Sequence, residues 1–189
     1  MGISQYNVAL FLHIGVVITS FMIAGVLHAS LHALPRVKSV HQMRPFAGLV
    51  HRLEPLLPIL AIFILGFGAW LIGASHHAWH WGDGWILTAL ITLIVIEGLA
   101  GSLLAPRTKA LVAAIDAAPD GDVPAELRRQ ALDPVIWDIA HVATFGFLGV
   151  VFVMTNKPSG GVATLIVVIG AIVGVALSRL QLAAAAKQS

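Results

Sequence analysis

Apolar positions divide the chain into five long hydrophobic stretches that are separated by polar connections. The stretches cover residues 6–33, 53–73, 85–105, 135–155 and 162–180. A helix needs about 20 mostly apolar residues to cross the ~30 Å hydrocarbon core of a bilayer, and all five stretches have about that length. The pattern therefore predicts an all-α polytopic membrane bundle of five transmembrane helices, formed by a single domain over residues 1–189.

The connection over residues 106–134 is the longest of the polar segments. Its stretches 110–115 and 125–132 favour two short surface helices, and Pro119-Asp120-Gly121 interrupts them. Two interpretations of this cytoplasmic segment remain open. It is either a solvated connector or a surface whose arginines meet anionic lipid headgroups.

Composition agrees with a membrane protein and excludes several classes of function. The chain is 58% hydrophobic and 11% charged, whereas soluble domains carry about 25% charged residues. The net charge of +2 gives no reason to expect a nucleic-acid partner. The absence of cysteine excludes disulfides, thiolate metal sites and covalently attached haem. No glycine-rich phosphate loop occurs in a strand–loop–helix context.

The distribution of positive charge predicts the orientation of the bundle. All but one of the eleven lysines and arginines fall on the same side of the predicted helices, and Lys157 is the exception. Because such residues accumulate in cytoplasmic segments, we expect the N-terminus outside and the C-terminus in the cytoplasm. The first stretch lacks a positively charged region before it and contains histidine, so we expect a transmembrane helix there and not a cleaved signal peptide.

Seven ionisable side chains are predicted to lie at similar depth on four helices. They are His28, His32, His51, Glu54, Glu97, Asp138 and His141. With a rise of about 1.5 Å per residue, His32 and His51 reach the cytoplasmic interface and the other five lie in the cytoplasmic half of the bilayer. An ionisable group in hydrocarbon is costly unless it is paired, so such a cluster indicates a functional site.

Three interpretations of this cluster remain open. In the first, His28 and His141 hold a b-type haem. In the second, a non-haem metal is bound by these two histidines together with Glu54 and Glu97. In both cases Glu54, Glu97 and Asp138 are candidates for catalysis, as proton carriers or as groups that orient the rings. In the third, the charged groups, including Arg52, only satisfy one another and join the helices.

A second group of candidate ligands lies on the opposite side of the membrane. His76, His77, His80 and Asp83 fall within eight residues of one short connection, and copper or zinc would suit them. The alternative is that these histidines are polar interfacial residues beside a belt of tryptophans. His13 lies in the outer half of the first helix and is a candidate ligand of a second haem, which would need its other ligand from a loop.

The fifth stretch differs from the others because small residues recur along it. Gly170 and Gly174 form a GxxxG motif, which permits close approach of another helix. We expect four helices around the polar core and a fifth at the periphery. The motif would pack against a neighbouring helix, or against a partner subunit or a second copy of the chain.

Short motifs resemble those of a group of small bacterial membrane proteins. The segment Leu12-His13-Ile14-Gly15-Val16-Val17, with Gly25 further on, matches the group's opening pattern, and Arg52, Pro55, Pro58 and Gly66 resemble the second helix. Residues 153–158 resemble a Met-x-x-Lys-Pro ending of the fourth helix. The group includes the copper-resistance-D-like domain, the membrane protoporphyrinogen oxidase of bacteria and uncharacterised relatives.

This resemblance implies a helical bundle in the bacterial inner membrane. His13 would match the first-helix histidine of the group. The oxidase branch is associated with b-type haem and the copper branch with copper handling. Glu97, Asp138 and His141 belong to no motif of the group, so the resemblance does not transfer a specific activity.

We therefore expect a haem- or metal-binding redox protein of the bacterial inner membrane, alone or as a subunit of a larger complex. If it is an enzyme, it is an oxidoreductase. One alternative is handling or transport of copper or another cation, with capture by the outer histidines and Asp83. Another is a non-catalytic assembly subunit whose buried charges are structural.

Overall fold

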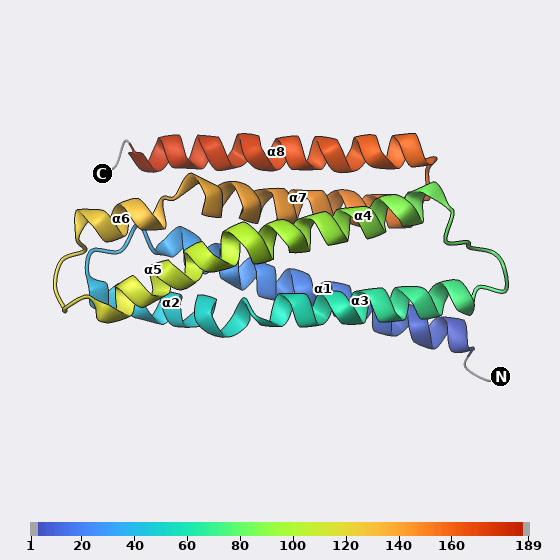
Figure 1. The fold of residues 1–189 in the computed structure, drawn as a ribbon, viewed down its shortest axis with the longest axis horizontal. Coiled ribbons are helices and arrows are strands. Elements are labelled where there is room, and N and C mark those ends of the chain that lie inside the picture. The colour runs from blue at the N-terminus through green and yellow to red at the C-terminus, as the bar shows by residue number, and fades with distance from the viewer. Residues whose placement is uncertain (1–3, 187–189) are drawn as a thin grey trace.

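The protein is seen in a computed structural model that describes residues 4–186, and within these residues it contains helices and no strand. The helices run roughly along one long axis (Figure 1). In chain order the elements are α1 (Gln5–Ala33), α2 (Val40–Leu53), α3 (Leu56–Gly73), α4 (Gly84–Leu99), the π-helical turn η1 (Ala100–Leu104), α5 (Ala105–Ala117), α6 (Ala125–Ala131), α7 (Pro134–Asn156) and α8 (Gly160–Ala186).

The five predicted membrane helices are confirmed. The described chain contains five helical segments that are long and apolar enough to cross a bilayer. Large apolar side chains cover their outer surfaces, with Phe11 75% exposed, Ile62 69% exposed and Leu180 67% exposed. An apolar surface of this extent is unfavourable in water, but it is the surface that a protein presents to lipid chains.

Helix ends follow from local capping chemistry. The Ser4 side chain accepts a hydrogen bond from the Asn7 N–H at the start of α1, and Asp133 accepts one from the Val135 N–H at the start of α7. Pro134 occupies the first position of α7, where its missing N–H costs nothing. At the other end of α7, Lys157 adopts a left-handed conformation with φ of 48° and ends the helix.

Helix α2 was assigned to a connection in the sequence analysis, and the structure corrects this. Val40, Met43, Ala47 and Val50 lie three or four residues apart and are at most 2% exposed. This spacing places them on one face of the helix. That face packs against α5, and α2 continues almost in line with α3 (Figure 1).

The segment 106–134 is likewise more than a solvated connector. In α5, Leu111 is 2% exposed and Ile115 is 0% exposed, and in α6 Leu127 is 5% exposed. These residues form one apolar core with α2 and with the end of α1 and the start of α7. We call this part of the molecule, α2 with α5 and α6, the basic-end cap, because most of the lysines and arginines lie there.

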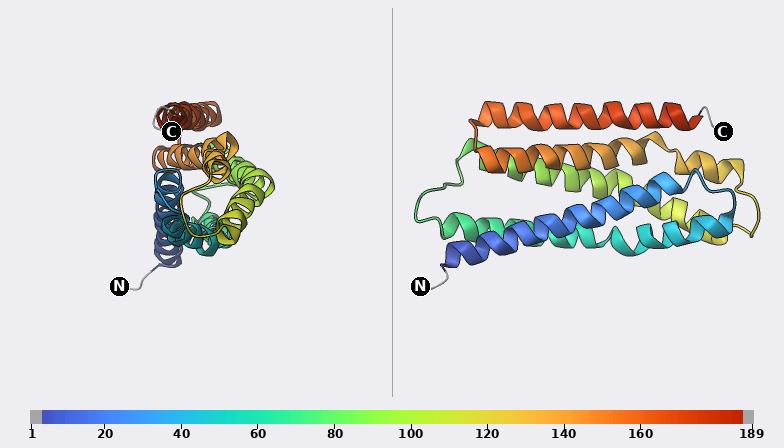
Figure 2. Two further views of the ribbon diagram at one scale, coloured as in Figure 1. Left: turned by 90° about the vertical axis from the view of Figure 1, so that its left-hand side faces the viewer. Right: turned by 180° about the vertical axis from the view of Figure 1, so that it is seen from behind.

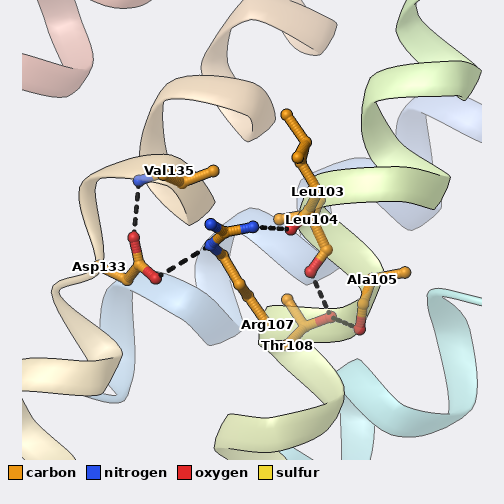
Figure 3. A network of polar contacts seen from close by, with 7 residues as sticks. All are labelled: Leu103, Leu104, Ala105, Arg107, Thr108, Asp133 and Val135. Carbon is orange, nitrogen blue, oxygen red and sulfur yellow. Dashed lines mark hydrogen bonds and ion pairs between the residues drawn. The ribbon is translucent and has the colours of Figure 1, made fainter.

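Helix α4 was expected to end before Pro106, but the structure carries it through η1 into α5. Pro106 has no N–H for the carbonyl of Ser102, and its ring would collide with that carbonyl in a regular α-helix. A single π turn, bonding the Ala105 N–H to the Ala100 carbonyl, accommodates the proline without ending the helix. Figure 3 shows this junction, where Arg107 donates to the Leu103 carbonyl at 2.9 Å.

Arg107 also connects the junction to the start of α7. Its Nε atom lies 3.4 Å from a carboxylate oxygen of Asp133, the residue that caps α7 (Figure 3). One side chain therefore holds the π turn and the first turn of α7 together. The orientation of α7, which carries two of the candidate site residues, depends in part on this contact.

The GxxxG motif packs on α7 of the same chain. A Cβ atom at Gly170 would lie 2.5 Å from the Phe145 carbonyl oxygen, and one at Gly174 would lie 2.7 Å from that of His141. Helix α8 lies outside α7, at the side away from α1 and α3, as expected for a peripheral helix (Figure 2). The GxxxG motif therefore packs against α7 of the same chain, and it is not available to a partner subunit.

Helix α8 also touches α4 at the end opposite the basic-end cap. The backbones of Gly84 and Gly160 are so close that a Cβ atom at Gly84 would lie 2.5 Å from the Gly160 Cα, and one at Gly160 would lie 3.1 Å from the Gly84 Cα. The hydroxyl groups of Thr88 and Thr164 lie 3.3 Å apart one turn further on. Helix α8 is consequently fixed against two helices, which explains why it needs small residues along its inner face.

We expect Gly174→Ala to destabilise the protein although alanine favours a helix. The intrinsic gain is about 0.8–1.0 kcal/mol, whereas overpacking a tight contact costs about 1–3 kcal/mol. Thermal unfolding in detergent should show a lower midpoint for this variant. Gly25→Ala is the control, because a Cβ atom there meets nothing within 4 Å. Equal midpoints for the two variants would contradict the close α7–α8 contact.

Candidate functional site

Three histidine rings converge between α1 and α7. The ring centroids of His28 and His141 are 5.0 Å apart, those of His32 and His141 are 6.0 Å apart, and those of His28 and His32 are 6.3 Å apart. Helix α1 starts beside α3 and runs diagonally to the beginning of α7, which makes the meeting possible (Figure 2). The predicted pair His28–His141 is thus brought together. We call the three residues the histidine cluster.

His32 belongs to this cluster, although the sequence analysis placed it at the interface. It follows His28 by four residues, so the two rings share one face of α1. Trp137 lies between the cluster and the basic-end cap. Its ring meets His32 edge-on at 4.6 Å and stacks on His141 at 5.9 Å. Because Trp137 is only 4% exposed and its Nε1–H donates to the Ala131 carbonyl, it is a fixed wall.

Hydrogen bonding determines which nitrogen of His141 carries a proton. Its Nδ1 atom lies 2.8 Å from the Trp137 carbonyl oxygen, which can only accept. The Nδ1 atom therefore carries the proton, and Nε2 presents a lone pair. A ring held in this way is in the usual state of a metal-binding histidine. The side chain is 3% exposed, so the orientation is fixed by packing as well.

A contact with Thr144 determines in the same way which nitrogen of His28 carries the proton. The Thr144 hydroxyl donates its single proton to the Ala140 carbonyl at 3.0 Å. Its oxygen can then only accept from His28 Nδ1, which lies 3.5 Å away. His28 Nε2 is left with a lone pair, and this atom is buried without a hydrogen-bond partner among the described residues. A buried polar atom without a partner is unusual and requires an explanation.

His32 is in the opposite state. Its Nδ1 atom lies 3.3 Å from Nη1 of Arg36, and the same Nη1 donates to the His32 carbonyl at 2.6 Å. Because an arginine is always protonated, His32 Nδ1 must accept, and the proton of the neutral ring is on Nε2. The cluster thus offers two lone pairs, from His28 and His141, and one N–H donor.

The candidate carboxylates face other partners. Both oxygens of Glu54 contact the buried hydroxyl of Thr108, at 2.9 and 2.7 Å. Asp138 accepts from Ser178 at 2.6 Å and pairs with Arg179, both on α8. Glu54, at the end of α2, therefore joins the turn between α2 and α3 to α5, and Asp138 joins α7 to α8. Within the described residues neither acid bonds to a cluster histidine.

Glu97 lies half-buried on α4, one residue from Ile96, which packs against Gly146 of α7. Its carboxylate has no hydrogen bond or ion pair among residues 4–186. The predicted structural partners, Asp138, His141 and Arg52, do not reach it. Glu97 stays a candidate proton carrier on position alone.

The loop between α3 and α4 is organised around a cation and two tryptophans. Lys157 Nζ lies 4.8 Å from the centre of a Trp79 ring and 5.8 Å from that of Trp85, a cation–π arrangement. Asp83 accepts from the His80 backbone N–H at 3.0 Å. His77 and His80 stack at 6.4 Å, and His76 and His77 adopt positive φ angles of 52° and 69°.

The candidate metal ligands can be compared for how many of them lie around one point. Across residues 4–186, no three His, Asp or Glu side chains are arranged to hold a metal ion together. This applies to the predicted group His76, His77, His80 and Asp83, and also to the predicted set of His28, His141, Glu54 and Glu97.

His13 packs against α3 in the half of the bundle away from the cap. Its Nδ1 atom donates to the Ile64 carbonyl at 3.1 Å, and the ring lies over Gly68, where a Cβ atom would be 3.4 Å from it. The absent side chain at Gly68 makes room for the imidazole. The structure brings no second histidine to this ring among the described contacts.

Comparisons with protein families, curated proteins and solved structures find no match to this chain. The resemblance to the copper-resistance-D-like and protoporphyrinogen-oxidase-like group therefore stays a prediction from short motifs.

Three residues of the site were missed by sequence reasoning, namely Arg36, Trp137 and Thr144. The signal was present in part, since Arg36 follows His32 by four residues and Trp137 precedes His141 by four. Thr144 gave no such signal, because its role depends on α1 crossing α7. Residues four apart on a helix are neighbours, so these pairs could have been found once the rings were chosen.

We expect Thr108→Val to destabilise the contact between α5 and the end of α2. The substitution keeps the shape of the side chain but leaves the Glu54 carboxylate without its donor, at a cost of about 1–3 kcal/mol. Thermal unfolding in detergent measures the effect. Thr19→Val is the control, because Thr19 is exposed and bonds only to the preceding turn. A Thr108 variant as stable as this control would show that Glu54 does not depend on the hydroxyl.

Proposed function

We propose that the protein binds a redox-active metal ion between Nε2 of His28 and Nε2 of His141, with copper as the best match. One observation carries the proposal. His28 Nε2 is a buried lone pair without a partner, beside a second imidazole whose lone pair is also on Nε2. A bound cation would satisfy both atoms at once.

The ring separation favours a metal ion over a haem. Two imidazoles on opposite faces of a haem iron, with bonds of about 2 Å as for zinc, have centroids roughly 6 Å apart, and the porphyrin lies between them. The rings of His28 and His141 are 5.0 Å apart and meet edge to face. Two imidazoles at a tetrahedral angle around one ion have centroids about 5 Å apart, which agrees with the observed distance.

The number of ligands favours copper over zinc. Zinc in proteins normally has at least three protein ligands, and the described residues offer no such set. Copper is suited to imidazole, and a copper ion held by two imidazoles at the bent angle of these rings would complete its coordination with a further, non-protein ligand. The Nε2–H of His32 would lie beside the ion as a hydrogen-bond donor to any further ligand.

The membrane setting supports a role in electron transfer or copper handling. The lysines and arginines of the basic-end cap would face the cytoplasm, since such residues accumulate there. The histidine cluster then lies in the cytoplasmic half of a bacterial inner membrane. An ion with two protein ligands keeps open positions, and such an ion can exchange electrons or be passed to another carrier.

Removing one imidazole should abolish copper binding. We expect purified protein with His28→Ala or His141→Ala to lose its stoichiometric copper, measured by titration of copper(I) against a chelator of known affinity. His51→Ala is the matched control, because it removes an exposed histidine from the same end of the molecule. Unchanged stoichiometry in the His28 and His141 variants would refute the site. Unchanged thermal unfolding of the variants without copper would show that the fold is intact.

The optical spectrum separates copper from haem. Protein purified from cells supplied with haem precursors should show no Soret band and no α-band after reduction. A Soret band that disappears in His141→Ala would instead establish the haem interpretation. A band that disappears in His13→Ala would place the haem at the opposite end of the bundle.

A further inference from the structure

An open groove of about 610 Å³ lies where the chain turns from α1 into α2. Its wall consists of Arg36, Val37, Lys38, His41, Gln42, Pro45 and Phe46. Its lining residues belong to the connection between α1 and α2 and to the first turns of α2. This connection lies at the same end of the bundle as α5 and α6 (Figure 1). The groove is separate from the histidine cluster, although Arg36 touches both.

The polar lining of the groove consists of donors. Arg36, Lys38 and His41 are exposed, and none of them forms an ion pair within the described residues. Gln42 uses its side-chain oxygen to accept from the Lys38 backbone N–H at 3.1 Å, which leaves the amide NH₂ for another acceptor. No acidic residue lines the groove.

Arg36 is held in a position that suits an anion. Its Nη1 is engaged by the His32 carbonyl and ring, so the edge formed by Nε and Nη2 stays free. This edge presents two parallel N–H groups, the geometry that binds two oxygens of a phosphate or carboxylate. Of the two acids on the adjoining segment, Asp120 is paired with Arg44. Asp122, whose backbone pairs with Ser39, does not line the groove.

We propose that this groove binds a phosphate group. Arg36 would hold two of its oxygens, Lys38 would supply a second positive charge, and Gln42 would donate from its amide. The apolar side chains of Val37, Pro45 and Phe46 would contact whatever the phosphate is attached to. Two sources share this chemistry, the headgroup of an anionic lipid and a soluble phosphate compound.

The test uses the full chain in detergent after removal of metals with a chelator. Its result therefore does not depend on the proposed copper site. One titration adds inorganic phosphate, and another adds short-chain phosphatidylglycerol, with phosphatidylcholine as its uncharged counterpart. Saturable binding of phosphatidylglycerol but not of phosphate or phosphatidylcholine identifies a lipid site. Saturable binding of inorganic phosphate identifies a site for soluble phosphates.

Two variants connect the binding to the groove. Arg36→Gln should weaken binding about tenfold or more, and Lys38→Gln several-fold, because each removes a charged donor. Lys109→Gln is the control, since it removes the same charge from an exposed position at the same end but outside the groove. Equal losses of affinity in all three variants would show that net charge alone attracts the ligand, and this would overturn the proposal. The absence of saturable binding of either ligand would also overturn it.

Discussion

The bundle depends on one constraint, namely that polar groups in hydrocarbon must find their partners within the protein. Most hydroxyl groups meet it by donating to a carbonyl one turn earlier on the same helix, as Ser30, Thr92, Ser102 and Thr144 do. His141 uses the same device with its ring. The Nε2 atom of His28 does not follow this rule, because it is buried without a hydrogen-bond partner among the described residues. Leaving a buried polar atom without a partner costs stability, and such an atom indicates a functional site.

Helix α7 is the element through which the site and the scaffold are coupled. The ring of His141 faces α1, while its carbonyl oxygen faces Gly174 of α8. One turn earlier, Asp138 bonds to Ser178. The acid that was expected to serve the histidines therefore fixes the far side of their helix. Packing of α8 against α7 and α4 thus determines where one of the two lone pairs lies.

The sequence predicts those features of the fold and the site that depend on hydropathy and on depth in the membrane. The five spans follow from apolar length, and His28 with His141 follows from their similar distance to the membrane boundary. The partners of Glu54 and Asp138 did not follow, because helix rotation depends on packing that depth does not reveal. Helix α2 was missed for another reason. Its pattern is that of an ordinary amphipathic helix, whose hydropathy is too low to distinguish it from a polar connection.

The π turn at η1 has a consequence for how this protein can vary. A π turn adds one residue to a helix, and one residue corresponds to about 100° of rotation. In α4 the buried face runs through Ile86, Ala89, Leu93 and Ile96, and in α5 it runs through Thr108, Leu111 and Ile115. The extra residue brings the second face into line with α2. Deleting a single residue there would turn the whole of α5 away from α2 by about that angle, and Pro106 would again collide with the preceding turn. Homologous chains should therefore tolerate substitutions in this turn better than changes in its length.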